Sequence, residues 1–148
     1  MSTDLIALWH ERARPQPTEA DFNVQLGCHL EEIAEMLECL SVGMNDYSLT
    51  AGTNTPAYRA LCDLSNALKK GQLIAKITDR KEMLDSLADQ VVTAIGVAHC
   101  SGLGVVEGVR RVNTSNWSKF VDGRPLRDAN GKITKGPQYE PPVLDGLY

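Results

Sequence analysis

The chain has 148 residues, of which 43% are hydrophobic and only 5% aromatic, and 15 Lys and Arg side chains against 19 Asp and Glu give a formal net charge of −4. This size and composition predict a single domain over residues 1–148. Apolar stretches such as residues 91–98 are far shorter than the ~18–20 residues of a membrane-spanning helix, and no signal peptide pattern opens the chain. We therefore expect a cytoplasmic protein without a membrane partner.

The cysteines exclude two further classes of protein. They lie at spacings of 11, 23 and 38 residues and form no Cys-x-x-Cys pair, which argues against a zinc knuckle and against a disulfide framework. We interpret all four as buried thiols: Cys28, Cys39, Cys62 and Cys100.

The charges are unevenly distributed along the chain. Residues 1–109 carry 15 acidic and 8 basic side chains, a net of −7, whereas residues 110–148 carry 7 basic and 4 acidic ones, a net of +3. A basic tail can bind nucleic acid. An acidic body with a basic tail is also typical of carboxylates that bind a metal ion and cations that bind phosphate.

Helical periodicity dominates the first three quarters of the chain. A short helix is predicted over residues 4–12, ended by Pro15 and Pro17. A longer one runs from a Thr18 cap to a stop at Gly43, because its apolar residues recur every three or four positions.

Three more helices follow. Residues 44–55 are rich in Asn, Thr and Gly and predict a loop, after which Thr55 and Pro56 are typical of a helix start. That helix closes at residues 69–71, another runs from about residue 78 to 101, and a short one spans about 104–117.

The last part of the chain changes character. The dipeptides Asp122-Gly123 and Asn130-Gly131 are strong turn signals and predict a small polar hairpin, and the prolines beyond them predict an extended end. The expected fold is all-α: a bundle of four to five helices with a small C-terminal hairpin and extended tail. Such a thin bundle leaves apolar faces that we expect oligomerisation to cover.

Two acidic clusters occupy predicted helices. Glu31, Glu32 and Glu35 form the pattern E-E-x-x-E on one side of the second helix, and a second cluster, Glu82, Asp85 and Asp89, shares one face of the fourth. Like charges at this spacing repel and destabilise a helix, which indicates that the charge is used.

Apolar neighbours border both stripes, so we expect the two helices to pack together and bring the carboxylates near one another. Converging carboxylate oxygens are suited to Mg²⁺, with Mn²⁺ as a substitute, and the scattered histidines at positions 10, 29 and 99 disfavour zinc. The alternative interpretation is that both acidic faces are simply solvated surface.

E-E-x-x-E followed by E-x-x-D resembles the all-α nucleoside triphosphate pyrophosphohydrolases of the MazG type. Residues 85–96 resemble the end of the family's second metal-binding helix, and residues 112–119 and 135–142 resemble the phosphate-contacting C-terminal part of short phage and bacterial MazG-like proteins. The 46 residues between Glu35 and Glu82 exceed the usual separation, so residues 44–70 look like an inserted loop and helix.

The resemblance implies hydrolysis of the bond between the α and β phosphates of a nucleoside triphosphate to a monophosphate and pyrophosphate. The implied metal ligands are Glu31, Glu32, Glu35, Glu82 and Asp85, and Glu32 or Glu35 would orient or deprotonate the attacking water. Asp89 would bind the metal or support its ligands. Some phage members, the MazZ group, act on guanine nucleotides, so dGTP or GTP is the expected substrate; the host cytoplasm is the expected location if the chain is phage-encoded.

The tail, residues 118–148, and the helix before it supply the expected substrate contacts. Donors suited to phosphate and sugar oxygens are Asn113, Asn116, Lys119, Lys135 and Tyr139. The arginines at positions 110, 111, 124 and 127 are expected to be surface charge. A nucleobase could stack on one of a few aromatic side chains that could equally be core anchors: Trp9, Phe22, Trp117 and Phe120.

Two alternatives remain. A dUTPase-like enzyme or a scavenger of damaged nucleotides would share the fold and the metal site. A non-enzymatic helical module whose tail binds nucleic acid or protein belongs to another class, but seven basic residues interrupted by four acidic ones make a weak polyanion-binding pattern, so no nucleic-acid partner is expected. The family assembles as tight dimers, often paired into tetramers, and the same is expected of this chain.

Overall fold

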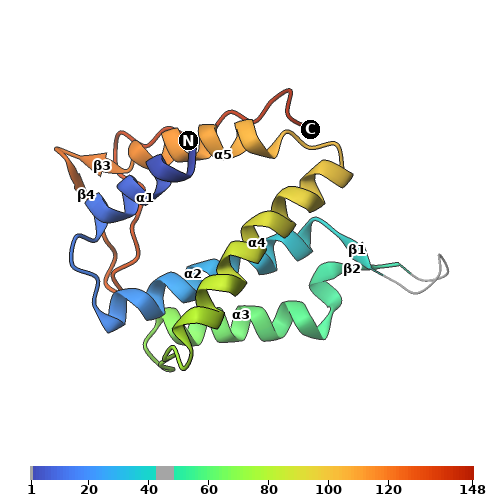
Figure 1. Ribbon diagram of the computed structural model, residues 1–148, viewed down its shortest axis with the longest axis horizontal. Coiled ribbons are helices and arrows are strands. Elements are labelled where there is room, and N and C mark those ends of the chain that lie inside the picture. The colour runs from blue at the N-terminus through green and yellow to red at the C-terminus, as the bar shows by residue number, and fades with distance from the viewer. Residues whose placement is uncertain (1, 43–48) are drawn as a thin grey trace. The chain divides into compact units, whose positions relative to one another are not determined.

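A computed structural model describes residues 2–42 and 49–148, and five α-helices account for most of this part of the chain (Figure 1). The predicted all-α class is therefore confirmed. The chain divides into two compact units. We call them the α2/α3 unit, Pro17–Ala75 with Arg127–Lys132, and the α1/α4/α5 unit, which comprises Met1–Gln16, Lys76–Leu126 and Ile133–Tyr148.

The α2/α3 unit begins with helix α2, Glu19–Glu38. Its cap is a reciprocal pair: the Thr18 hydroxyl accepts a hydrogen bond from the Asp21 backbone N–H at 3.1 Å, and the Asp21 carboxylate accepts one from the Thr18 N–H at 3.1 Å. This pair satisfies N–H groups that the first turn of a helix leaves without partners. The Thr18 start was therefore predicted correctly.

Helix α2 ends earlier than the predicted stop at Gly43. The helix stops at Glu38 and the chain continues into the two-residue strand β1, Ser41–Val42, which pairs antiparallel with β2, Thr50–Ala51. A 3-10 helix, Gly52–Asn54, follows. Within the predicted loop over residues 44–55, residues 50–54 therefore have regular structure. Gly43, predicted as the helix stop, and residues 44–48 lie outside the described residues.

Close packing against the end of α2 explains this structure. The Gly52 N–H donates to the Leu40 carbonyl at 2.8 Å, and a Cβ on Gly52 would lie 1.9 Å from the Leu37 carbonyl oxygen. Only glycine fits this approach. The helix α3, Pro56–Lys69, then starts as predicted, with the Thr55 hydroxyl accepting from the Tyr58 N–H at 3.2 Å.

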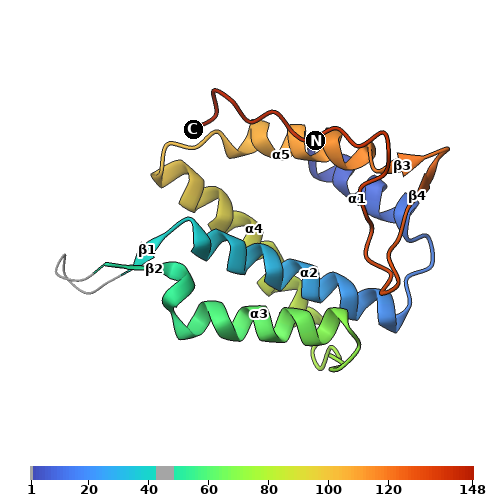
Figure 2. The same ribbon diagram turned by 180° about the vertical axis from the view of Figure 1, so that it is seen from behind.

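Helices α2 and α3 run side by side and are joined by the β1–β2 hairpin (Figures 1 and 2). Small residues bring them together: the Ser65 hydroxyl donates to the Gly27 carbonyl at 2.8 Å, and Ser65 is only 2% exposed. A Cβ on Gly27 would lie 2.7 Å from Lys69 Cγ and 2.9 Å from the Ser65 carbonyl oxygen. The close approach of the two helices therefore depends on the missing side chain of Gly27.

The α1/α4/α5 unit contains α1, Ser2–Ala13, α4, Arg80–Cys100, and α5, Val105–Trp117. Asp79 caps α4 by accepting from the backbone N–H groups of Lys81 and Glu82, and Gly102 has a φ of +71° in the corner before α5. At the Asp122-Gly123 turn, β3, Phe120–Val121, pairs with β4, Arg124–Pro125. Residues 124–127 and 132–135, which were expected to flank the Asn130-Gly131 turn, are linked there by backbone hydrogen bonds of 2.9 Å from the Thr134 N–H to the Leu126 carbonyl and from the Asp128 N–H to the Lys132 carbonyl.

Aromatic residues anchor α1 to α5. Trp9 is 7% exposed, its ring packs edge-on against Phe120 at 5.9 Å between centroids, and its Nε1–H donates to the Asn116 carbonyl at 2.9 Å. Trp117 lies 5.3 Å from Phe120. Of the two interpretations offered for these side chains, the core role is confirmed for Trp9.

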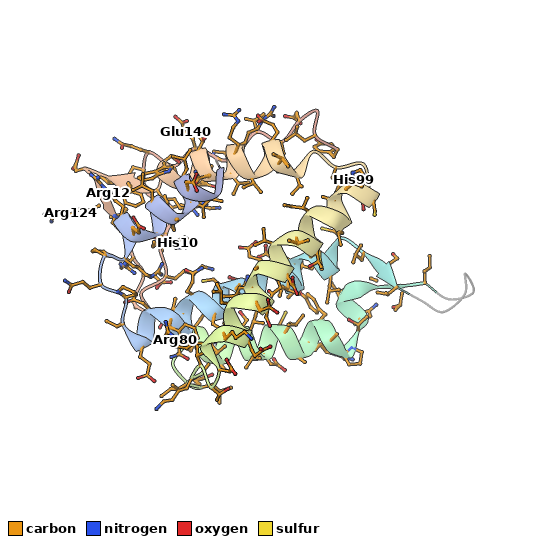
Figure 3. The ribbon with its side chains drawn as sticks, in the orientation of Figure 1. His10, Arg12, Arg80, His99, Arg124 and Glu140 are labelled. Carbon is orange, nitrogen blue, oxygen red and sulfur yellow. The ribbon has the colours of Figure 1, made fainter. Side chains whose placement is uncertain are left out.

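The C-terminal segment is extended, as its prolines predict, and is fixed to α5. The Ser115 hydroxyl donates to the Glu140 carbonyl at 2.6 Å, and the Gly104 N–H donates to the Leu147 carbonyl at 2.7 Å. Glu140 and the labelled α1 residues His10 and Arg12 can be located in Figure 3.

Much of the apolar surface of α4 is exposed. Exposed fractions reach 70% at Leu84, 66% at Val92 and 57% at Val97. Among the described residues, no single helix is long and apolar enough to cross a membrane; α4 and α5 would reach the required length only together, and they are bent by 120°.

The cysteines form no disulfide, as predicted, but the prediction of four buried thiols is wrong. Cys28 and Cys62 are half-buried, whereas Cys39 and Cys100 are exposed. The two exposed residues lie at helix ends, Cys39 just after α2 and Cys100 at the last position of α4, where fewer neighbours cover a side chain.

Candidate functional site

The first acidic motif lies on the C-terminal half of α2. Glu31 is half-buried, and Glu32 and Glu35 are exposed. The helix places Glu31 and Glu35 one turn apart. The motif therefore forms a row of carboxylates along one side of α2.

Glu31 is held by two lysines from segments distant in the sequence. Its Oε1 accepts from Lys69 Nζ, on α3, at 2.5 Å, and its Oε2 accepts from Lys132 Nζ, in the tail, at 2.7 Å. Burial alone would raise the pKa of Glu31, but the hydrogen bonds from Lys132 and Lys69 outweigh it and the net pKa is lowered. The same hydrogen bond raises the pKa of Lys132 against the effect of burial.

Each lysine is positioned by its own local structure. Lys69 is positioned by the close contact of α3 with Gly27 on α2. Gly27 lies one helical turn before Glu31. Lys132 follows a tight turn in which Asp128 Oδ1 accepts from the backbone N–H groups of Asn130 and Lys132, both at 2.9 Å.

Arg127 fixes that turn to α2. Its Nη1 lies 3.4 Å from Asp21 Oδ1 and donates to the Gly131 carbonyl at 2.9 Å. The tail residues Arg127 and Lys132 thus both contact acidic side chains of α2. Arg127 was expected to be surface charge only, and this contact was not anticipated.

The remaining glutamates of the row repel one another. The pKa of Glu35 is raised first by a partial loss of hydration and then by the negative charges of Glu32, Glu31 and Glu38, while the charge of Lys132 acts in the opposite direction. Glu38 accepts a hydrogen bond from the Tyr58 hydroxyl at 2.6 Å, and this bond is the main cause of the raised pKa of Tyr58.

The second acidic motif belongs to the other unit. Glu82, Asp85 and Asp89 lie on α4 and are all exposed. Leu84 and Leu87, the apolar neighbours of this stripe, are 70% and 38% exposed. In residues 2–42 and 49–148, no three His, Cys, Asp or Glu side chains converge to hold a metal ion.

Three of the expected substrate contacts come together in the α1/α4/α5 unit. The Nζ atoms of Lys119 and Lys135 lie 5.9 Å and 4.9 Å from the centroid of the Tyr139 ring. Two ammonium groups beside one aromatic ring concentrate positive charge at this point of the tail.

Asn113 and Asn116 lie elsewhere in the same unit. They line an apolar cavity of about 490 Å³ formed by α1, the α4–α5 corner, α5 and the C-terminal residues. Asn113 is 6% exposed. These two amides thus share a cavity whose other lining side chains are mostly apolar, rather than the lysine cluster around Tyr139.

The arginines of α5 are engaged locally. Arg110 and Arg111 both bind Glu107, and the hydrogen bonds from Arg110 and then Arg111 lower the pKa of Glu107 to about 2. Arg111 also donates to the Val143 carbonyl at 2.9 Å. They therefore stabilise the helix surface and its tail contact, in keeping with the surface role expected of them.

Sequence reasoning did not identify Lys69 and Lys132 as site residues. They lie 38 and 101 residues from Glu31, and neither belongs to a motif. A usable signal was the pair of small residues, Gly27 and Ser65, at corresponding positions of two predicted helices, since small residues allow close helix contact.

Comparison of the chain with protein family models, with curated proteins and with solved structures found no match in any of the three.

Proposed function

We propose that this chain is an Mg²⁺-dependent nucleotide pyrophosphohydrolase of the MazG-like type, which cleaves the α–β phosphoanhydride of a nucleoside triphosphate to a monophosphate and pyrophosphate. The observation that supports it most is the carboxylate row on α2 with Lys69 and Lys132 bound at Glu31. Carboxylates for a metal ion and cations for phosphate are the two charge types that such chemistry needs side by side.

The donor chemistry of the acidic residues fits Mg²⁺, with Mn²⁺ as a substitute, because carboxylate oxygens are the ligands these ions prefer. The proposed ligands are Glu31, Glu32, Glu35, Glu82 and Asp85. When bound, the ion would supply positive charge to the phosphate oxygens. Glu32 or Glu35, both exposed, would orient or deprotonate the attacking water.

The tail would bind the substrate. Lys119 and Lys135 would contact phosphate oxygens, and Tyr139 holds both cations over its ring. Asn113 and Asn116 would offer amide groups to the sugar or base from their apolar cavity, and dGTP or GTP is the first substrate to test.

We further propose that the chain works as a homo-oligomer, a tight dimer at least. The support is the exposed apolar surface of α4, because an apolar helix face of this size is usually covered by another element.

The test is hydrolysis of a panel of nucleoside triphosphates, including dGTP, GTP and dUTP, with Mg²⁺, followed by separation of the products. Glu35→Gln and Glu82→Gln should each lower kcat by more than about 100-fold, since even groups behind metal ligands cost about 10–100-fold. Glu38→Gln is the matched control on the same helix; Gln can still accept from Tyr58, so this variant should keep its activity.

Two results would overturn the proposal. Release of orthophosphate and a diphosphate would exclude cleavage between the α and β phosphates. Full activity of both Glu35→Gln and Glu82→Gln would exclude the carboxylates from the reaction.

A further inference from the structure

Both oxygens of the Glu31 carboxylate are occupied by ammonium groups. Lys69 contacts Oε1 at 2.5 Å and Lys132 contacts Oε2 at 2.7 Å. Within the described residues, by contrast, Glu32 and Glu35 form no ion pair with a cation. One carboxylate of the row thus has two direct ammonium partners, whereas Glu32 and Glu35 feel the charge of Lys132 without an ion pair to it.

This cluster differs from an ordinary surface ion pair. The Lys69 side chain is 13% exposed and that of Glu31 29%, so both charges are partly removed from water. Exposed pairs contribute little to stability because solvent screens them, but a partly buried pair is screened less. The Gly27 contact positions Lys69, and the Asp128 turn positions Lys132. The two lysines therefore come from segments far apart in the sequence.

A divalent cation could not join this arrangement without changing it. An ion about 2.0–2.1 Å from either Glu31 oxygen would lie within a few Å of both ammonium groups, and like charges at that distance repel strongly. The lysines would then have to withdraw. Their flexible four-carbon stems would keep the ammonium groups close to the carboxylate row.

We propose that Lys69 and Lys132 are exchangeable counterions of Glu31: they neutralise its carboxylate in the metal-free chain and bind phosphate groups of the substrate once Glu31 takes up a divalent cation. The inference rests on the proposed function in one respect, that Glu31 is a metal ligand. It adds two phosphate-binding residues, one of them on α3, that no motif assigns.

The exchange predicts opposite effects on two ligands. Lys69→Met and Lys132→Met remove a competitor, so each should tighten the binding of Mn²⁺ alone by about two- to fivefold, the range expected for one ion pair. The same variants should weaken the binding of inorganic pyrophosphate in the presence of Mn²⁺ by about tenfold or more, because a charge-assisted contact is lost. Free Mn²⁺ is followed by its electron paramagnetic resonance signal and pyrophosphate by calorimetry.

Lys70→Met is the matched control. It removes the same charge from the adjacent residue, which is exposed and makes no ion pair with a described residue, and it should change neither affinity. Circular dichroism checks that each variant keeps its helices. If Lys69→Met does not fold, Lys132→Met, in the tail turn, provides the same test.

Unchanged or weaker Mn²⁺ binding by the Met variants would overturn the counterion role, and unchanged pyrophosphate binding would overturn the phosphate role. These outcomes differ from a failure of the proposed function. If both opposite effects occur but the wild-type chain hydrolyses no nucleoside triphosphate, the proposed function is wrong and the exchange stands.

Discussion

His10 lies in a half-buried position at the edge of the Trp9 ring, with the ring centroids 4.9 Å apart. Burial, and then the positive charge of Arg14, lower its pKa below 6.5. The unfolded chain therefore binds a proton at His10 more readily than the folded chain does. Its effect on stability is constant above about pH 6.5, and stability falls as the pH drops below that value towards the folded pKa.

We therefore predict that His10→Asn reduces the loss of stability between pH 7.5 and pH 5. The measurement is the urea midpoint at both pH values, compared with the wild type. His99→Asn, at the exposed C-terminal end of α4, is the control and should retain the wild-type difference between the two midpoints (Figure 3). A His10→Asn profile parallel to that of the wild type would contradict the argument.

Ser65 is the most deeply buried polar side chain between α2 and α3, and it donates to the Gly27 carbonyl at 2.8 Å. Ser65→Ala leaves that carbonyl without this partner, so the free energy of unfolding should fall by about 1–3 kcal/mol. Denaturation in urea measures it. Ser86→Ala on the exposed surface of α4 should stay within about 0.5 kcal/mol of the wild type, and equal effects of the two variants would contradict the assignment.

At the scale of helices, two glycines should respond oppositely to the same substitution. Gly27→Ala places a methyl group 2.7 Å from Lys69 Cγ and 2.9 Å from the Ser65 carbonyl oxygen, so it should destabilise the chain by about 1–3 kcal/mol and displace α3. Gly96→Ala, within α4, meets nothing within 4 Å and should stabilise the chain by about 0.5–1 kcal/mol. Thermal unfolding of both variants tests this, and a stabilised Gly27→Ala would exclude a tight contact there.

The starts of α2 and α3 were predictable because their caps are local. Thr18 and Thr55 each accept a hydrogen bond from a backbone N–H three residues away, so the neighbouring sequence carries the information. The end of α2 was not predictable in this way. It depends on the contact of Gly52 with Leu37 and Leu40, which the sequence places more than ten residues apart.

In the candidate site, too, the features set by local sequence were predictable and those set by distant contacts were not. The row of glutamates on α2 follows from helical spacing alone. Its countercharges do not, because Lys69 and Lys132 reach Glu31 only through the packing of α3 and the tail turn. The basic tail was expected to bind phosphate. In the structure, Arg127 and Lys132 of the tail also contact Asp21 and Glu31 on α2, and these contacts were not anticipated from the sequence.

At the scale of the whole molecule, we expect the chain to self-associate, because the apolar face of α4 is exposed. Light scattering after gel filtration should give at least twice the 16.2 kDa mass of one chain. Val92→Lys places a charge at a position 66% exposed in the single chain, so it should fold normally but shift the mass towards one chain. A wild-type mass of one chain would contradict the proposed assembly.

The central claim concerns which bond is cleaved, and ³¹P nuclear magnetic resonance of dGTP with the wild-type chain and Mg²⁺ tests it most directly. The proposal predicts that the signals of dGMP and pyrophosphate grow in equal amounts and that neither grows when Mg²⁺ is chelated. Signals of dGDP and orthophosphate, or dGTP and other nucleoside triphosphates that stay intact, would contradict it.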